Sequence, residues 1–227
     1  MNDPIINDNH AVSGDNYSVR LVTATPKAEI IMAYIARVSS PNQENPSFEN
    51  LLSYCLRKCH WSVFEHAFMT VEIVTSRMIS QQIIRHKSFS FSEFSQRYAP
   101  ATNMVKYEPR RQDDKNRQSS IDDLPDEIIR GFEHRLAEIQ RGSMKVYEYF
   151  VGLGVAKECA RAMLPLSTET KLYMTGSCRS WIHYIQVRTD LSVQKEHREI
   201  AAAIDTIFSV VFPTVHKAMA TMKEGAQ

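Results

Sequence analysis

The chain is poor in glycine and in long apolar runs, and its charge is nearly balanced. Its seven glycines form neither a GxGxxG nor a GxxxxGK[ST] pattern, which excludes the Rossmann and P-loop phosphate cradles. Twenty-seven Lys and Arg against 26 Asp and Glu leave a formal charge of +1, so no overall field attracts nucleic acid or an anionic membrane. If the chain binds a nucleotide, side chains must replace the glycine-loop amides, chiefly arginine, histidine and hydroxyl groups.

Secretion and membrane insertion are also disfavoured. The first 17 residues lack the basic and apolar regions of a signal peptide, and no apolar run reaches 18 residues. We therefore expect a cytoplasmic protein. In that compartment the four cysteines are expected to be buried thiols and not a disulfide framework: Cys55, Cys59, Cys159 and Cys178.

Composition and patterning predict one folded domain. Hydrophobic residues make up 43% of the 227 residues, enough for a single core. Residues 1–17 are polar and aperiodic and predict a disordered or loosely attached tail. Residues 18–220 contain no linker or internal repeat and are expected to form the domain.

Apolar periodicity predicts the elements of the first half. Strands are expected over 18–22 and 69–73, and helices over 25–38, 47–60 and 76–87, with a short helical turn at 62–65. Thr25 and Ser76 are predicted to cap their helices, and Ser62 with Glu65 fits a capping box. The polar segment 106–124 predicts a mobile, exposed loop.

The second half is predicted to be helical. Helices are expected over 125–152, 155–164 and 168–187, and a last one from Gln194 must kink or end at Pro213. The longest has an apolar face made of Ile128, Phe132, Leu136, Ile139, Val146 and Phe150. The predicted fold class is α+β, a small, mostly antiparallel sheet covered by many helices.

The segment RHKSFSFSEFSQRY, residues 85–98, concentrates the chemistry. Six Lys and Arg lie within residues 85–111 against two Glu, and the segment adds serine hydroxyls that donate to phosphate and carbonyl oxygens. These groups suit a nucleotide pocket. A solvated basic loop whose phenylalanines fill the core, or an alternating strand over SFSFS, explains the same pattern. Periodicity does not choose between these readings.

This segment resembles the signature of the flavin-dependent thymidylate synthases, in which Arg-His-Arg is followed at fixed spacing by Ser, Glu, Ser and Arg. Lys87 departs from it, because the family most often has arginine there and lysine lacks the guanidinium fork. Segments 36–39, 60–66, 159–166 and 179–183, Arg188 and 194–200 also resemble the family in the right order. The resemblance covers about residues 18–215 and includes these motif positions: Arg85, His86, Ser90, Glu93, Ser95, Arg97 and Tyr98.

The resemblance implies the family's fold and a single catalytic domain that makes dTMP from dUMP. FAD would carry hydride, NADPH would reduce it, and methylenetetrahydrofolate would donate the carbon. It also implies a homotetramer with active sites between subunits, and neither nucleic-acid nor membrane partners.

The resemblance also assigns residues. Arg188 is expected to stabilise negative charge on the uracil, and Ser95 to orient the pyrimidine without attacking it, because no base lies beside it in the sequence. Arg97 and Arg161 are suited to the dUMP phosphate. The flavin set is Ser39, His60, Ser62, Arg85, His86, Lys87, Glu93, Ser177, Arg179 and His183. The dUMP set is Gln82, Arg85, Glu93, Ser95, Gln96, Arg97, Arg161 and Arg188.

Other functions and sites remain to be weighed. A nucleic-acid binder would stack bases on the phenylalanines and meet phosphates with the arginines. A degenerate relative would bind flavin and nucleotide without methylation. No metal site is predicted, because the spacing around His60 and Cys59 matches no zinc pattern.

Overall fold

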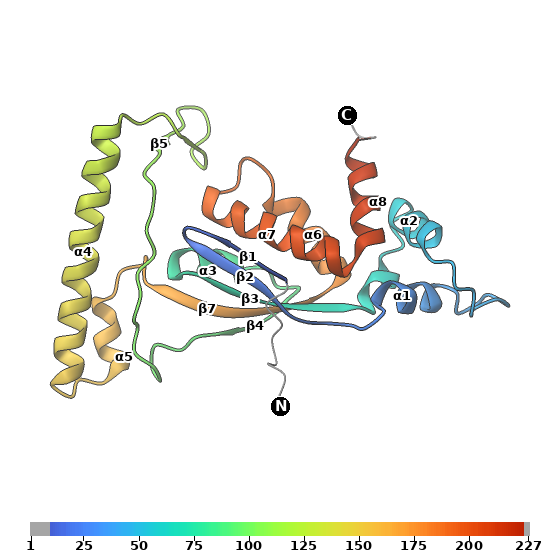
Figure 1. Cartoon of the computed structure of the whole chain (residues 1–227), viewed down its shortest axis with the longest axis horizontal. Coiled ribbons are helices and arrows are strands. Elements are labelled where there is room, and N and C mark those ends of the chain that lie inside the picture. The colour runs from blue at the N-terminus through green and yellow to red at the C-terminus, as the bar shows by residue number, and fades with distance from the viewer. Residues whose placement is uncertain (1–9, 225–227) are drawn as a thin grey trace.

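The computed structural model describes residues 10–224, and its centre is a five-stranded antiparallel sheet (Figure 1). The strand order is β1-β2-β3-β7-β4, and β5 and β6 form a separate short hairpin. The central strands β3 and β7 pair along their whole length, from Phe68 opposite Ser177 to Ser76 opposite Glu169. The strands are β1 (Ala11–Gly14), β2 (Tyr17–Ala24), β3 (Phe68–Ser76), β4 (Ser90–Glu93), β5 (Arg111–Gln112), β6 (Ser120–Ile121) and β7 (Glu169–Ser177).

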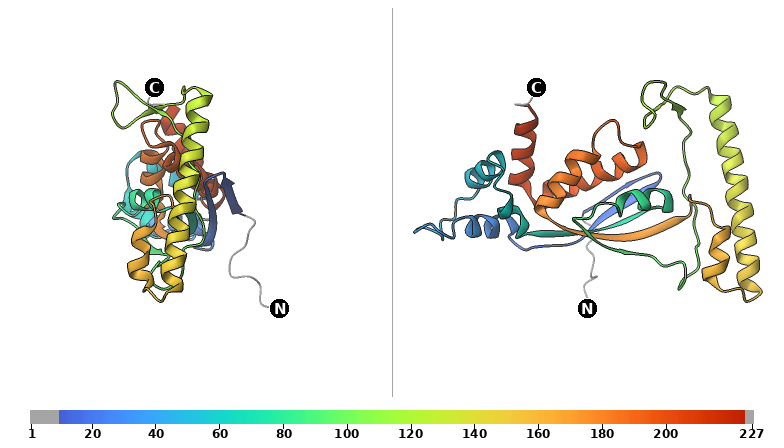
Figure 2. Two further views of the ribbon diagram at one scale, coloured as in Figure 1. Left: turned by 90° about the vertical axis from the view of Figure 1, so that its left-hand side faces the viewer. Right: turned by 180° about the vertical axis from the view of Figure 1, so that it is seen from behind.

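Helices lie on one face of the sheet and at its two ends. In Figures 1 and 2, α6 and α7 run over the sheet, α1 and α2 lie at one end, and α4 and α5 stand at the other. The helices are α1 (Ala28–Ala36), α2 (Glu49–Arg57), η2 (Trp61–Glu65), α3 (Arg77–Ile83), α4 (Asp126–Gly152), α5 (Lys157–Ala160), η3 (Arg161–Met163), α6 (Cys178–Arg188), α7 (Lys195–Val211) and α8 (Pro213–Glu224).

The core lies between the sheet and helices α6 and α7. Alternate residues of a strand face the same side, so Met69, Val71 and Ile73 of β3 all point into the core and are fully buried. Trp181 of α6 is also fully buried, and its indole Nε1 donates to the Met69 carbonyl at 3.0 Å. This packing fixes α6, whose last residue is Arg188, over the sheet.

The opposite face of the sheet is polar. Arg20 Nε donates to Glu72 at 2.9 Å, and the Tyr173 hydroxyl donates to the same carboxylate at 2.7 Å. Burial opposes ionisation of Glu72, but these hydrogen bonds and the charges of Arg20 and Lys171 outweigh it and lower its pKa. The alternation of apolar and polar positions therefore matches a sheet with one face in the core.

The predicted fold class is confirmed, and the main error lies at residues 168–187. The first half of that predicted helix is strand β7, and only its second half is helix α6. Thr170, Leu172 and Met174 are buried at every second position, which is strand periodicity. Pairing with both β3 and β4 makes β7 a central strand, and this tertiary context decides its conformation.

Several predicted elements have different limits. The strands predicted at 18–22 and 69–73 lie within β2 and β3, and Ser76 caps α3 by accepting from the Ile79 amide at 3.3 Å. Thr25 does not cap α1, because its hydroxyl accepts from the Phe68 amide at 2.9 Å. The helix predicted at 155–164 is only the short α5 followed by η3, and η2 has no side-chain cap, so no capping box forms.

The amino-terminal region differs from the expectation. Residues 11–14, within the predicted tail 1–17, form edge strand β1 and pair with β2 from Ala11 opposite Arg20 to Gly14 opposite Tyr17. Residues 1–9 of the predicted tail lie outside the described residues. At the other end, α7 stops at Val211 and α8 begins at Pro213, as predicted.

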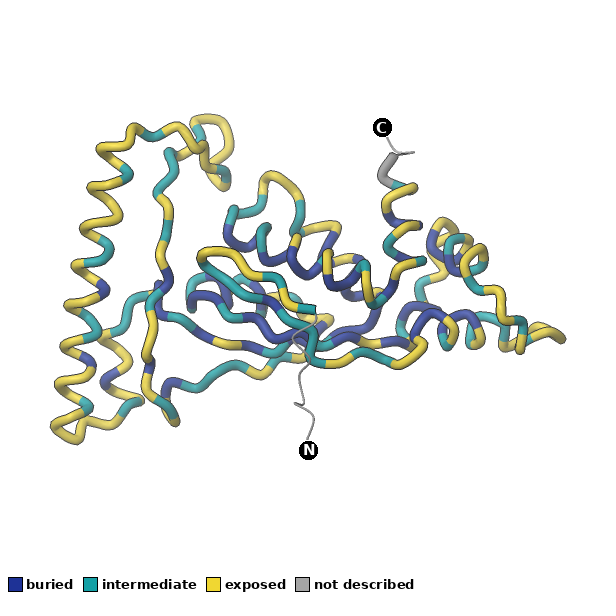
Figure 3. Tube along the Cα trace, in the orientation of Figure 1, coloured by how far each residue is buried: buried dark blue, intermediate teal, exposed yellow. Residues whose placement is uncertain are grey.

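The predicted helix 125–152 is α4, but its apolar face lies outside the core. Ile128, Phe132 and Ile139 of this face are 53%, 43% and 61% exposed. Figure 3 shows α4 at the edge of the molecule, with most of its residues coloured as exposed. A helix with an uncovered apolar face is typical of a contact with another chain.

Two of the four thiols contradict the prediction of burial. Cys55 and Cys178 are buried, and burial raises the pKa of each thiol. Cys59 and Cys159 are exposed. Cys59 follows α2 in the left-handed region, with φ 56°, so it lies beyond the helix face that enters the core.

Over residues 10–224, no helix has the length and apolar character needed to cross a membrane.

Candidate functional site

Arg188 is held at the end of α6 by a neutral histidine. Its Nε donates to His86 Nε2 at 2.7 Å. Burial, together with the charge of Arg188 and the proximity of His183, lowers the pKa of His86 to about 4, so the ring is neutral at pH 7 and can accept this bond. Within residues 10–224 no hydrogen bond involves the terminal nitrogens of Arg188. The guanidinium is therefore oriented while its two outer nitrogens can donate to a ligand.

Gln82, in the last turn of α3, belongs to the same group through His197, whose ring lies 6.4 Å from that of His86. Its Nε2 donates to Gln194 Oε1 at 2.7 Å, and its Oε1 lies 3.4 Å from His197 Nδ1. These contacts join the end of α3 to the start of α7. The structure thus brings together three of the predicted residues, namely Gln82, His86 and Arg188.

The predicted phosphate ligands form a second group, beside α5. Arg97 Nε pairs with Glu158 of α5 at 3.2 Å, and both side chains are more than half exposed. Arg161 is exposed at the start of η3, which follows α5 directly. The Ser95 hydroxyl accepts from the Arg97 amide at 3.4 Å, and Gln96 is buried beside it in the chain.

Glu93, predicted to contact both flavin and dUMP, ends the edge strand β4. Its Oε1 pairs with Arg77 at 2.8 Å and accepts from the Thr170 hydroxyl at 3.0 Å. Strand β4 confirms the alternating-strand alternative for the second half of the SFSFS segment, since Ser90 to Glu93 pair with β7 while Ser88 and Phe89 precede the strand. The phenylalanines divide accordingly, with Phe89 buried in the core and Phe91 packed against it.

A third group surrounds Glu65. Ser177 donates to Glu65 Oε2 at 2.7 Å, and Arg179 Nη1 pairs with Glu65 Oε1 at 2.9 Å. The Arg179 guanidinium also lies 5.9 Å from the centre of the Trp61 ring. Sequence reasoning missed Glu65 as a site residue because it interpreted this side chain as part of a capping box. The segment 60–66 that contains it was the available signal.

The remaining flavin candidates have exposed side chains. His60 and Ser62 lie at η2 and Ser39 lies just after α1, at the end of the sheet where α1 and α2 are found (Figure 1). The Tyr54 and His60 rings meet edge to face, 5.8 Å apart. The exposed candidates are Ser39, His60, Ser62, Arg85, Lys87, Arg179 and His183.

A single protomer does not unite the predicted site. Figures 1 and 2 place α5, with Arg97 and Arg161, at the opposite end of the sheet from α1 and η2, where Ser39 and His60 lie. The Arg188 group lies between them, where α6 ends. All three groups expose donors or cations, as an anionic ligand requires, but they lie apart.

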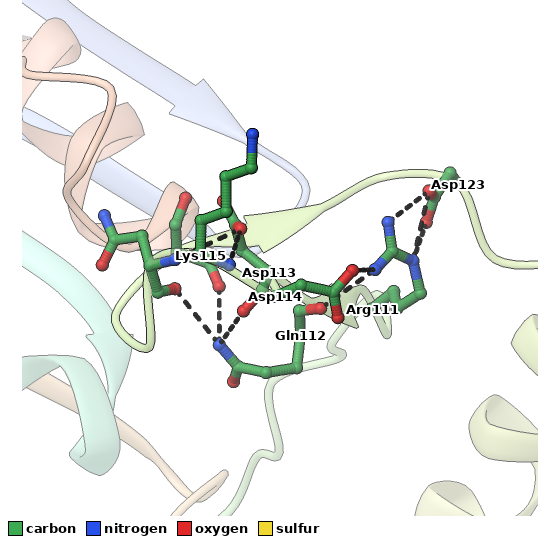
Figure 4. A network of polar contacts seen from close by, with 8 residues as sticks. Arg111, Gln112, Asp113, Asp114, Lys115 and Asp123 are labelled. Atoms are coloured by element: carbon green, nitrogen blue, oxygen red, sulfur yellow. Dashed lines mark hydrogen bonds and ion pairs between the residues drawn. The ribbon is translucent and has the colours of Figure 1, made fainter.

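The predicted loop 106–124 contains a small hairpin joined to α7. Arg111 forms a two-point ion pair with Asp123, at 3.0 and 2.8 Å (Figure 4). Within the turn, Gln112 Nε2 donates to the Ser119 carbonyl, and Asp113 Oδ1 accepts from the Lys115 amide. Arg110 pairs with Glu196 of α7 at 2.7 Å through side chains that are both nearly buried. The loop is largely exposed, as predicted. Its mobility stays a prediction.

Two hollows in the described surface lie elsewhere. One of about 1070 Å³ separates α4 from the β1–β2 turn and segment 104–108, and one of about 420 Å³ lies between the β5–β6 hairpin and the start of α7. No residue of the predicted flavin or dUMP sets lines either. Among the described residues, no group of three or more His, Cys, Asp or Glu is placed to hold a metal ion.

The chain is similar in fold to a solved methylase. It aligns with the UMP/dUMP methylase PolB from Streptomyces cacaoi, crystallised with 5-Br dUMP, with a TM-score of 0.78. The alignment covers 91% of this chain and 96% of that one, at 24% sequence identity. At this identity the likeness establishes the fold.

Sequence relatives identify the family. A flavin-dependent thymidylate synthase from Synechocystis is 55% identical, over 84% of this chain and 89% of the relative. A probable flavin-dependent thymidylate synthase from Paramecium bursaria Chlorella virus 1 is 45% identical, over 88% and 94%. The family described as thymidylate synthase complementing protein matches residues 20–214. The chain therefore belongs to the flavin-dependent thymidylate synthase family.

Proposed function

We propose that this chain catalyses the reductive methylation of dUMP to dTMP. Bound FAD supplies hydride transfer, with NADPH as its reductant and methylenetetrahydrofolate as the source of carbon. The observation that carries the proposal is the Arg188 guanidinium, fixed through Nε by the neutral ring of His86. Residues 18–220 act as one catalytic domain. We infer a cytoplasmic location from the same function, because dTMP is a precursor for DNA synthesis.

Arg188 and Ser95 act on the pyrimidine. A guanidinium that is already oriented stabilises negative charge on the uracil ring without moving a proton, and its orientation is set before the substrate arrives. Ser95 orients the base. Its hydroxyl accepts from the Arg97 amide, and a cationic neighbour does not remove the hydroxyl proton, so it does not become a nucleophile.

The remaining predicted residues fit FAD and the dUMP phosphate. Permanently charged forks at Arg97 and Arg161 suit a phosphate, which they can meet in two-point contacts. A flavin dinucleotide carries two phosphates and a ring with several acceptors, which suit the arginine, lysine, histidine and serine donors of this set, while Glu93 can accept from the flavin's own N–H and hydroxyl groups. The residues of the set are Ser39, His60, Ser62, Arg85, His86, Lys87, Glu93, Ser177, Arg179 and His183.

The active sites of this proposal lie between subunits of a homotetramer. Two observations support it. Arg97 and Arg161 stand beside α5, apart from Arg188, and α4 exposes apolar residues such as Ile139 and Tyr149. A second subunit that covered α4 would bury this face. We expect light scattering to give about four times the 26.0 kDa mass of one chain.

Subunit mixing tests the shared site. Arg161→Ala and Arg188→Ala chains are expressed separately and together. Each variant alone is expected to be inactive, whereas mixed oligomers regain part of the activity because some sites combine the intact Arg161 of one subunit with the intact Arg188 of another. Activity that never returns in verified mixed oligomers contradicts shared sites.

An omission assay tests the reaction itself. The purified protein is incubated with dUMP, FAD, NADPH and methylenetetrahydrofolate, and dTMP is separated by chromatography. We expect dTMP only when all four are present. No dTMP in the complete mixture, or equal dTMP without FAD, would refute the proposed function. Uptake of FAD and dUMP without dTMP would identify the degenerate relative, and salt-dependent oligonucleotide binding without flavin would identify the nucleic-acid binder.

A further inference from the structure

Gln82 belongs to a line of hydrogen-bonded polar side chains whose other members are not assigned to flavin or dUMP, and which are buried or partly buried. The Tyr184 hydroxyl lies 3.1 Å from His197 Nε2, and His197 Nδ1 lies 3.4 Å from Gln82 Oε1. Gln82 Nε2 donates to Gln194, whose own amide nitrogen donates to Glu196 Oε2 at 2.9 Å. Tyr184 and His197 are completely buried.

The Glu196 end of this line determines which group donates and which accepts in each hydrogen bond. The Glu196 carboxylate accepts hydrogen bonds and is paired with Arg110 at 2.7 Å, so the Gln194 amide must present its NH₂ to Glu196 and its carbonyl to Gln82. Gln82 then donates through Nε2 and presents its carbonyl oxygen to His197. Each amide in the line has only one orientation that satisfies both of its neighbours.

At the other end of the line, His197 and Tyr184 have fixed donor and acceptor roles as well. Since the Gln82 oxygen can only accept, His197 must carry its proton on Nδ1, which leaves Nε2 to accept from the Tyr184 hydroxyl. Burial, together with the charge of Arg188 and the neighbouring His86, lowers the pKa of His197 to about 3. The ring is therefore neutral at pH 7, as this arrangement requires.

We propose that Tyr184 and His197 are positioning residues that hold the Gln82 amide in one orientation for the nucleotide. The proposal rests on the proposed function, in which Gln82 contacts dUMP. An amide held by one partner can turn end for end and exchange its donor with its acceptor. Held between His197 and Gln194, Gln82 offers the remaining hydrogen of its NH₂ and the remaining lone pair of its oxygen at fixed places. The same line also connects this amide to Arg110 in segment 106–124.

Steady-state kinetics of the FAD-loaded enzyme test this role. His197→Leu removes the donor to Gln82 and is expected to raise the KM for dUMP roughly 3- to 10-fold, the effect of one hydrogen bond, while kcat stays unchanged. His197→Asn keeps an NH₂ near the place of Nδ1 and should restore most of the affinity. Tyr184→Phe keeps the ring in its site but leaves His197 Nε2 without a donor, and should raise the same KM by a smaller factor.

Two controls separate positioning from general damage. Tyr34→Phe removes a hydroxyl from a partly exposed side chain of α1 and should leave the KM for dUMP unchanged. The dissociation constant for dUMP, measured by calorimetry on the same variants, should rise in parallel with KM. Should His197→Leu fail to fold, Tyr184→Phe decides the question alone.

Each outcome gives a decision. An unchanged KM for dUMP in a folded His197→Leu enzyme, or in Tyr184→Phe where the leucine variant does not fold, would overturn the proposal. So would an equal loss of kcat and flavin content in the leucine and asparagine variants, because that result marks a structural role. If the wild-type enzyme makes no dTMP, the proposed function itself has failed.

Discussion

The buried His197 should make the protein sensitive to acid. In the folded protein, the pKa of this histidine is lowered to about 3 by burial and by the nearby Arg188 and His86. An unfolded histidine titrates near 6.5. The unfolded state therefore binds more protons between these values, and the free energy of unfolding falls as the pH falls through this window. From about pH 7 to about pH 4.5 the difference amounts to about 2.5 kcal/mol for this single group.

Comparison with His197→Leu isolates that contribution. Groups that do not interact with His197 titrate in both proteins and cancel in the difference. Thermal unfolding is followed by tryptophan fluorescence, to which the fully buried Trp181 contributes. One protein concentration is used because association also shifts the midpoint. Between the two pH values the wild-type midpoint should fall about 5–10 °C further than that of the variant. Parallel pH dependence in the two proteins would refute the claim that His197 is buried as a neutral ring.

Three further substitutions test other parts of the structure. Arg188→Ala should lower dTMP formation by ~10²–10³ in rate while the fold is retained, and wild-type turnover would refute its role. Ser95→Ala should leave measurable activity, and complete loss with FAD and dUMP still bound would show that the hydroxyl is essential. Gly176→Ala would place Cβ 2.4 Å from the Phe89 ring and should destabilise the protein by about 1–3 kcal/mol, whereas Gly131→Ala in α4 meets nothing within 4 Å and should be neutral or stabilising.

Local patterns predicted most of the fold. The capping Ser76, the alternating apolar residues of β3 and the proline boundaries at 125 and 213 each depend on nearby residues, and each has its predicted effect. Strand β7 was missed because its sequence was assigned the periodicity of the helix that follows it. Its conformation depends on pairing with β3, about a hundred residues away, and the short alternation at Thr170, Leu172 and Met174 was not separated from the helical pattern that follows it.

The site was predictable in part, for a similar reason. The motif at residues 85–98 identified the charged groups. The helix predicted at 76–87 ends at Ile83, so Gln82 and His86 do not share a helix face, and their closeness depends on how the loop after α3 folds back. The partnership of His86 with Arg188 depends on how α6 packs over the sheet. The line of hydrogen bonds from Tyr184 to Glu196 depends on how α7 packs beside α6. No sequence motif contains residues of both helices. Glu65 meets Arg179 across 114 residues.

The arginines predicted for dUMP are distributed over two regions of the chain. Arg97 and Arg161 look equivalent to Arg188 as phosphate or base ligands in the sequence, yet they lie beside α5, away from α6. Such a distance is consistent with sites completed by a second subunit.

The most direct test is the absorption spectrum of the FAD-loaded protein under anaerobic conditions. NADPH should bleach the flavin bands, and they should return only after both dUMP and methylenetetrahydrofolate are added, with one dTMP formed for each flavin reoxidised. A protein that takes up no FAD, or whose reduced flavin recovers its colour without dUMP, would contradict the account.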